Sequence, residues 1–269
     1  MLNNIIDMNF GDGFGIGIKS YSKALNLMFS SNLAWFFIFP LILNISLFFI
    51  GTSAVGVLVD YLEQLANDSL GLNDADFFGS QAIRTSLSWA LYLIFKIMYF
   101  FSFAYVGGKI VIIFMSPVFT VLSEKIDKIL TGNTYPFSSE QMMRDIVRGI
   151  LIALRNMGIE LGIIILVLLI AFIPVIGWLI SLVSTFFLLI VSSYYYGFSF
   201  MDYSNERKRR NISQSSKFIW KNKGVAIGNG FVFALALLIP FCGTLLAGFV
   251  SIISVAAATI AMNELDKKS

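Results

Sequence analysis

Two long stretches of the chain carry no charged side chain, and the same short motif interrupts each of them. The stretches are residues 161–201 and 224–263, and the motif is Ile-Pro-x-x-Gly. Proline lacks the N–H that continues a helix, and glycine adopts the backbone angles that a reversing turn requires. Each stretch is therefore predicted to form a helical hairpin. The expected tips contain Pro174, Gly177, Pro240 and Gly243.

The arms of these hairpins are short for a membrane crossing. At ~1.5 Å per residue, residues 161–173 span about 20 Å and residues 224–239 about 24 Å, against a hydrocarbon core ~30 Å thick. We therefore favour re-entrant, half-penetrating hairpins over tight turns near the far interface. A third alternative is a pair of full spans joined by an exposed loop. Against it, the tips "IPVIGW" and "IPFCGT" lack charge.

Two further apolar runs precede the hairpins. Residues 33–59 carry no charge, and the only charge in 85–108 is Lys96, with apolar character continuing to residue 122. Only 13% of the chain is charged, against about 25% in soluble domains. The sequence thus predicts an all-α integral membrane protein, with residues 1–269 as one membrane domain. The predicted protein has two long transmembrane helices, two re-entrant hairpins and an N-terminal amphipathic helix.

The distribution of charge predicts an orientation. Residues 60–76 contain five acidic side chains and no basic one, whereas most lysines and arginines lie near the termini and in the linkers 123–160 and 202–223. The positive-inside rule then places loop 60–84 outside and both termini in the cytoplasm. The cluster Arg207–Arg210 is interpreted first as an anchor against anionic lipid, with direct attraction of anions as the alternative.

The segment before the first span has a helical apolar stripe. It consists of Phe14, Ile18, Tyr21, Leu25 and Met28. This spacing predicts an interfacial amphipathic helix over residues 13–29. The glycine-rich "GDGFGIG" within this region is not expected to bind a nucleotide, because no strand precedes it.

Few residues in this chain are suited to catalysis. The sequence has no histidine and one cysteine, and it shows no nucleophile motif, phosphate loop or metal-ligand spacing. We therefore expect no enzyme activity, cofactor, metal or nucleic-acid partner. Ser30–Asn32 offers hydroxyls and a helix N-cap at the start of the first span, where an anion can bind, although plain capping is the simpler interpretation. Lys96 is either functional or buried between subunits, or it reaches an interface or a neighbouring carbonyl.

Several segments, taken in order, resemble the CysZ family of bacterial inner-membrane sulfate permeases. They are "IKSYSKALNLMFSSNLAWFFIFPLILN", "SPVFTVLSEKID", "IPVIG", "YYYGFSFMDYSNERK" and the closing "GNGFVFALALLIP…VAAAT". The resemblance covers about residues 15–262. It implies two long transmembrane helices and two half-penetrating hairpins assembled into homo-oligomers in the lipid bilayer. It also implies channel-like sulfate uptake that feeds cysteine biosynthesis.

One departure from the family bears on the substrate. The Gly-Leu-Arg-Arg-type motif that the family ties to sulfate binding aligns with Asn32, Leu33, Ala34 and Trp35. Neither Ala34 nor Trp35 can replace the bidentate charge of arginine. Either Lys19, Lys23 or Lys96 compensates, or the substrate differs, or the chain is a membrane scaffold that no longer transports sulfate. The anion-binding candidates are Ser30, Ser31, Asn32, Leu33 and Lys96.

Overall fold

The described part of the chain is almost entirely helical. The computed structural model describes residues 9–69, 80–133, 139–173, 176–239 and 243–268, and no strand occurs among them. Its elements are α1 (Phe10–Ser30), the short 3-10 helix η1 (Ala34–Phe37), α2 (Ile38–Ser69), α3 (Ser80–Thr131), α4 (Ser139–Ala171), α5 (Ile176–Arg207), α6 (Ile212–Lys221), α7 (Lys223–Leu237) and α8 (Gly243–Lys268).

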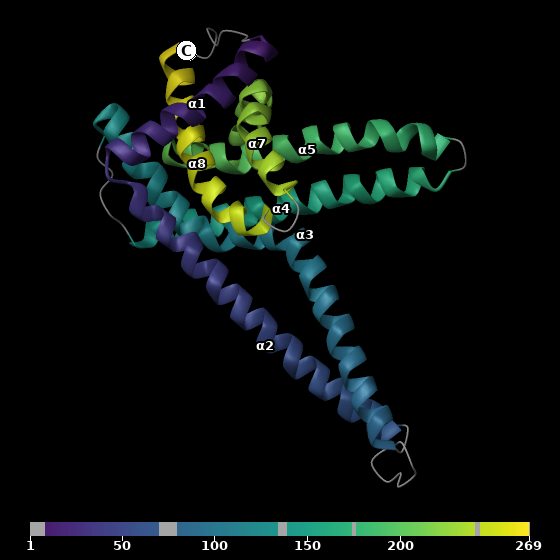
Figure 1. Cartoon of the computed structure of the whole chain (residues 1–269). Coiled ribbons are helices and arrows are strands. Elements are labelled where there is room, and N and C mark those ends of the chain that lie inside the picture. Colours follow the sequence, from purple (N-terminus) through teal and green to yellow (C-terminus); the bar gives the residue numbers. More distant parts are fainter. Residues whose placement is uncertain (1–8, 70–79, 134–138, 174–175, 240–242, 269) are drawn as a thin grey trace.

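Two helix pairs project from one packed body. The body contains α1, α7 and α8 with the adjoining parts of α3 and α5, and the pairs α2–α3 and α4–α5 leave it in different directions (Figure 1). Helix α3 contributes to both the body and an arm, and it changes direction along its length (Figure 1). Pro117 lies inside α3, where its missing N–H weakens the helix ladder and permits bending.

Helix α8 lies at the centre of the body. It contacts α1, α3, α5 and α7, and its middle part is built from small side chains that are fully buried. They include Ala256, Ala257, Ala258, Thr259 and Ala261. Small residues let neighbouring helices approach closely, which is a common way to pack helices in membrane proteins. The segment "VAAAT" is therefore a packing surface of the core.

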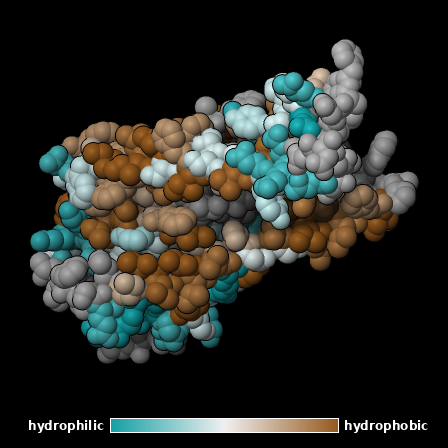
Figure 2. Space-filling model, turned by 90° about the horizontal axis from the view of Figure 1, so that it is seen from below, coloured by the Kyte–Doolittle hydropathy of each residue, from teal (hydrophilic) through white to brown (hydrophobic). Residues whose placement is uncertain are grey.

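The two arms are apolar on the outside. Four helices in the described part of the chain are long and apolar enough to cross a membrane: Ala34–Leu65, Ile146–Ala171, Val183–Arg207 and Leu246–Lys267. The most apolar window of the first is only 11% buried, whereas that of the last is 72% buried. Figure 2 shows broad hydrophobic areas on one face, with hydrophilic side chains gathered in separate patches. A soluble protein does not expose apolar surface on this scale, so the protein belongs in a membrane.

The helices extend beyond the uncharged stretches of the sequence. Helix α4 begins at Ser139, so the first arm of this hairpin has 33 residues, or about 50 Å. The arm is longer than predicted because the uncharged residues 161–173 are only its distal part, and the helix also includes residues 139–160. Arg148, in the first half of α4, is bound to Asp202 of α5, whereas Glu140 and Arg144 are exposed, so this part of the helix is only partly covered.

Both Ile-Pro-x-x-Gly motifs break their runs into two helices, as the sequence predicts. The Gly177 N–H donates to the carbonyl of Ile173 at 2.7 Å, and the Gly243 N–H donates to that of Ile239 at 2.9 Å. A Cβ atom on either glycine would overlap the carbonyl oxygen of the residue six positions earlier, Ala171 or Leu237. Pro174 and Pro240 lie outside the described residues. The glycine of each motif is thus required by a close backbone approach.

The early glycines form a helix-packing face. In α1, Gly13 and Gly17 are buried, and α7 presents Gly224 and Gly228 at the same four-residue spacing. A Cβ on Gly17 would lie 2.6 Å from the carbonyl oxygen of Val225. The glycine-rich segment therefore serves close packing of α1 on α7.

The predicted apolar stripe of α1 is divided between two faces. Tyr21 and Met28 are buried, as expected for a core face, but Ile18 and Leu25 are exposed. The buried face is completed by small residues, which pack against α7 and α8. Hydrophobic spacing alone overlooked these because glycine, serine and alanine add little to an apolar stripe.

Candidate anion-binding pocket

The turn predicted to start the first span instead ends α1. The Ser31 N–H donates to Leu27 O at 2.9 Å, and the Leu33 N–H donates to Met28 O at 2.9 Å. Asn32 between them has a φ of 56°, a left-handed conformation that asparagine tolerates well. This pattern satisfies the last carbonyls of α1. Ser30 also points back, with its Oγ 3.4 Å from Leu27 O.

The expectation of an N-cap at Ser30–Asn32 is therefore wrong. The N-cap of η1 is Leu33, which makes no side-chain capping bond, and α2 begins only at Ile38. The physical reason is that the chain uses these polar residues to close one helix before it opens the next. An anion site based on a capped N-terminus has no support at this turn.

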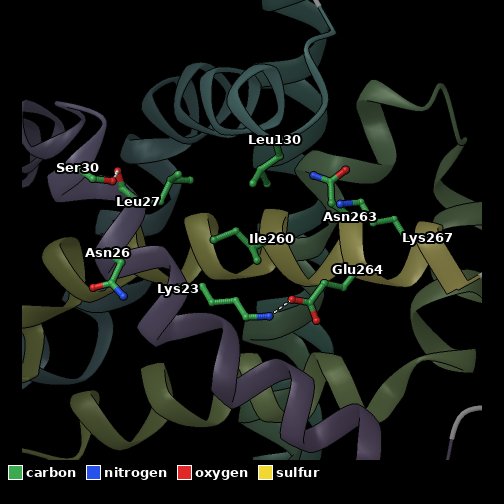
Figure 3. A pocket seen from close by; sticks show the side chains of 9 residues that line it. All are labelled: Lys23, Asn26, Leu27, Ser30, Leu130, Ile260, Asn263, Glu264 and Lys267. Carbon is green, nitrogen blue, oxygen red and sulfur yellow. Dashed lines mark hydrogen bonds and ion pairs between the residues drawn. The ribbon is translucent and has the colours of Figure 1, made fainter.

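A pocket of about 400 Å³ lies beside the turn and includes Ser30 (Figure 3). Its polar lining consists of Lys23, Asn26 and Ser30 from α1 with Asn263, Glu264 and Lys267 from α8. Leu27, Leu130 and Ile260 form its apolar floor. Both helices contribute at i, i+3, i+4 and i+7, so one face of α1 lies against one face of α8.

The charges of the pocket favour a small anion. Lys23 forms an ion pair with Glu264, and Lys267 also lines the pocket, so one positive charge is in excess. The Lys23 side chain is 55% exposed. An exposed pair of this kind contributes only ~0–1 kcal/mol, so a ligand anion can replace the carboxylate.

The remaining groups set limits on this attraction. Asn263 already donates to Asp127 Oδ1 at 2.8 Å, which makes it a poor additional donor. Helices α1, α3 and α8 all reach the pocket near their C-terminal ends, whose partial negative charge opposes an anion. Attraction must therefore come from Lys23 and Lys267.

A third lysine lies over the aromatic side chains of η1. The Nζ atom of Lys125, on α3, lies 4.9 Å from the ring centroid of Trp35 and 5.5 Å from that of Phe36. A cation over an aromatic face is favourable, most of all over tryptophan. Lys125 belongs to the family-like segment "SPVFTVLSEKID", but nothing in its local spacing identifies it as a neighbour of Trp35.

Lys96 does not join this site. It is exposed on α3, where its Nζ lies 3.1 Å from the Tyr92 hydroxyl, one helical turn earlier. The nearby Tyr99 donates to the carbonyl of Leu47 at 3.3 Å, which places this part of α3 beside the middle of α2. Leu47 is about 20 Å along the chain axis from Leu33. Of the predicted anion candidates, only Ser30 lines the pocket, and Leu33 is buried.

The basic cluster Arg207–Arg210 is divided: Arg207 and Arg210 are partly buried, whereas Lys208 and Arg209 are exposed, and their anchoring to anionic lipid stays a prediction. Arg207 donates to Ser123 and Ser204, Lys208 pairs with Asp266, and Arg210 donates to Asn205 Oδ1. Burial lowers the pKa of the Lys208 ammonium below its usual range, and Asp266 opposes this shift. Nearby acidic and polar side chains account for the direction of these basic side chains. The sequence alone did not indicate that these partners lie close to the cluster.

A buried ionic network adjoins that cluster. Arg148 of α4 binds Asp202 of α5 through two hydrogen bonds, Nε–Oδ2 and Nη2–Oδ1, both 3.1 Å long. Ser215 of α6 donates to the same carboxylate, and the Arg148 Nε also lies 3.6 Å from Glu206 Oε1. Charges this deeply buried persist because they are paired and hydrogen-bonded. The network joins α4, α5 and α6.

A buried carboxylate also lies at the base of the first hairpin. Glu160 is 4% exposed and accepts a 2.6 Å hydrogen bond from Ser192 Oγ. It lines a cavity of about 20 Å³ together with Asn156 and Ser199. Glu160 was not among the predicted site residues because it immediately precedes the uncharged stretch 161–201. The described residues contain no cluster of metal-ligating side chains.

The fold and the pocket define an all-helical, multi-pass membrane protein with a cationic pocket between α1, α3 and α8. The sequence matches the family model described as "Sulfate transporter CysZ/Etoposide-induced protein 2.4" over residues 20–247. The chain belongs to this family. A comparison with curated proteins finds no match. The matched range includes the α1 side of the pocket and ends before its α8 side.

Proposed function

We propose that the protein is a channel-like permease for sulfate or a similar small oxyanion in the bacterial inner membrane. The observation that carries this proposal is the cationic pocket formed by Lys23, Ser30 and Lys267 in a chain of the sulfate-transporter family. The pocket supplies two ammonium groups close to the turn that lacks the arginine pair. We assign the role of those arginines to Lys23 and Lys267, with Lys125 as an additional cation beside Trp35.

The proposed binding step exchanges one carboxylate for another oxyanion. Free protein holds Lys23 against Glu264, and an arriving sulfate replaces Glu264 as its partner while Lys267 supplies the second charge. The exchange costs little because the existing pair is open to water. A weakly held anion can also leave readily, as conduction requires.

The proposed orientation follows the charge distribution. The acidic segment 60–76 is assigned to the outside and both termini to the cytoplasm, together with the pocket near the C-terminal end of α8. In this proposal only the distal parts of the hairpins enter the bilayer, part-way from that side, and the base of α4 with Arg148 and Arg155 stays outside it. The α4–α5 arm exposes large apolar side chains towards its tip, including Phe172 at 78% and Phe186 at 72%. Lipid and further copies of the chain cover this surface in the proposed homo-oligomer.

Uptake of labelled sulfate into vesicles containing the purified protein tests this function. Lys23→Gln and Lys267→Gln should each weaken sulfate binding by about three- to tenfold, as expected for a water-exposed ionic contact. Lys128→Gln is the matched control, because Lys128 is exposed on α3 but does not line the pocket. Uptake no faster than in empty vesicles under several sulfate gradients would rule the proposal out.

The second candidate is a non-transporting membrane scaffold of the same fold. Ala34 and Trp35 favour it, because they occupy the positions of the family's oxyanion-binding arginines. A scaffold would leave sulfate-dependent growth normal in a deletion strain and would be recovered with a crosslinked partner. Restoration of sulfate uptake in a transport-deficient strain would exclude it.

A further inference from the structure

The bases of α4 and α5 meet α6 at the level where charge disappears from the first hairpin. Arg155 is the last basic residue of α4, and no further lysine or arginine follows until Arg207. Between them lies the uncharged stretch 161–201. This level therefore corresponds to the boundary between hydrocarbon and lipid headgroups.

Aromatic side chains mark the same boundary. Trp220, on α6, is 62% exposed, and its ring packs edge-on against Tyr194 of α5 at a centroid distance of 5.8 Å. Tyr194 in turn packs against Tyr195 at 5.3 Å. Tryptophan and tyrosine are enriched at membrane interfaces because their rings are apolar and their polar atoms remain hydrated.

Two cations lie along α6, one at Ser216 and one over the exposed Trp220 ring, one helical turn further on. Arg155 Nη1 donates to Ser216 Oγ at 3.2 Å, which fixes the guanidinium beside α6. Lys223 Nζ lies 5.1 Å from the Trp220 ring centroid. Among the described residues, neither Arg155 nor Lys223 pairs with a carboxylate. Their charge is thus available to a ligand, unlike that of the inward-facing Arg207 and Arg210.

We propose that Arg155, Ser216, Trp220 and Lys223 bind the headgroup phosphate of an anionic phospholipid. Arginine and lysine supply the charge, the serine hydroxyl is a further donor, and Trp220 covers the glycerol region. The acyl chains follow the apolar surface of α5, where Phe187 and Ile190 are about half exposed. The site fixes the base of the hairpin at the interface, and it does not depend on sulfate as the substrate.

Quenching of tryptophan fluorescence by brominated lipids tests the site. The protein is placed in phosphatidylcholine bilayers containing brominated phosphatidylglycerol or, separately, brominated phosphatidylcholine, and the signal of Trp220 is obtained by subtracting that of Trp220→Phe. Brominated phosphatidylglycerol should quench Trp220 at several-fold lower mole fraction. Arg155→Gln and Lys223→Gln should each weaken this preference about fivefold, the contribution of one surface charge.

Three controls make the outcome decisive. Arg144→Gln alters an exposed arginine of the same helix and should keep the preference, and Arg155→Lys should keep part of it. Each variant is compared after size-exclusion chromatography shows an unchanged oligomer. Equal quenching by the two lipids, or an unchanged preference in the Arg155→Gln/Lys223→Gln double variant, would overturn the proposal. Displacement of the lipid by soluble glycerol phosphate would instead identify a site for free phosphate and would also overturn it.

Discussion

At the residue scale, each hairpin turn depends on a glycine that lacks a Cβ. Gly177 and Gly243 occupy equivalent places, and each brings its backbone against a carbonyl six residues earlier. The match extends to the N–H donors and their isoleucine acceptors. Two segments far apart in the sequence thus share the same close glycine–carbonyl approach and the same backbone hydrogen bond, which supports an internal structural repeat.

Gly→Ala substitution should destabilise the protein at the two tight turns and not at glycines whose Cβ position is open. Gly177→Ala and Gly243→Ala should each lower the free energy of unfolding by ~1–3 kcal/mol, because the new Cβ would overlap backbone that cannot yield easily. Gly158→Ala and Gly162→Ala, in α4, meet no atom within 4 Å and should leave stability unchanged or slightly higher. Thermal unfolding in detergent measures the difference. Equal effects at all four positions would contradict the steric explanation.

The pocket shows what local sequence patterns could and could not reveal. Ser30 was identified as part of an expected helix N-cap, and it lines the pocket although that cap does not form. Lys96 was identified because it interrupts an apolar run, and it lies elsewhere. Lys267 and Asn263 come from the far end of the chain. No spacing rule connects them with Lys23, because their proximity depends on how α8 packs against α1.

At the scale of helices, small residues decide which elements touch. The close approach of α1 to α7 uses Gly17 and Gly228, and that of α5 to α7 uses Gly197 and Gly230. Helix α7 is therefore held between two neighbours by glycines on different faces. Apolar periodicity predicted a helix at α1, and the uncharged runs with their Pro-Gly motifs predicted helices at α5 and α7. None of these patterns identified the neighbours of each helix, because glycine adds no apolar area.

Substitution of Gly17 should weaken the α1–α7 contact, whereas substitution of the nearby Gly15 should not. Gly17→Ala should destabilise the protein by ~1–3 kcal/mol, since its Cβ would lie 2.7 Å from the Asn229 nitrogen. Gly15→Ala, in the same glycine-rich segment, meets nothing within 4 Å and should be neutral or stabilising. Limited proteolysis and thermal unfolding provide the measurement. A large effect at position 15 and none at 17 would assign the segment to a different face.

The buried ionic network should be worth far more than the ion pairs on the surface. Asp202→Asn removes the carboxylate that binds Arg148 through two hydrogen bonds and leaves Glu206, 3.6 Å away, as its remaining acidic partner. Loss of one partner from a buried pair costs ~3–5 kcal/mol, and Glu206 should offset part of that cost. Glu140→Gln removes an exposed partner of Arg144 and should cost less than ~1 kcal/mol. Unfolding of both variants in the same detergent compares them directly. A stable Asp202→Asn protein would show that the network adds no net stability.

At the scale of the whole molecule, composition predicted the membrane class and the helices but not their arrangement. Scarce charge and long apolar runs were sufficient for an all-helical membrane protein, and the two motifs located the breaks in the runs. The inward direction of Arg207 and the central place of α8 were not predictable. Both depend on contacts between segments more than fifty residues apart, and helix periodicity contains no information about such contacts.

The arrangement of the arms also makes a single orientation testable. Two single-cysteine variants in a Cys242→Ser background test the orientation. Gln64→Cys lies on the α2–α3 arm, which is predicted to face outward, and Ser213→Cys lies on α6, which is predicted to face the cytoplasm. Both positions are exposed. Impermeant maleimide added to spheroplasts should therefore label Gln64→Cys and spare Ser213→Cys until the membrane is permeabilised, because acidic and basic segments sort to opposite sides. Labelling of Ser213→Cys before permeabilisation would contradict the orientation. Equal labelling of both sites would mean that protomers insert both ways, so the positive charges of the cytoplasmic linkers would not suffice to orient this fold.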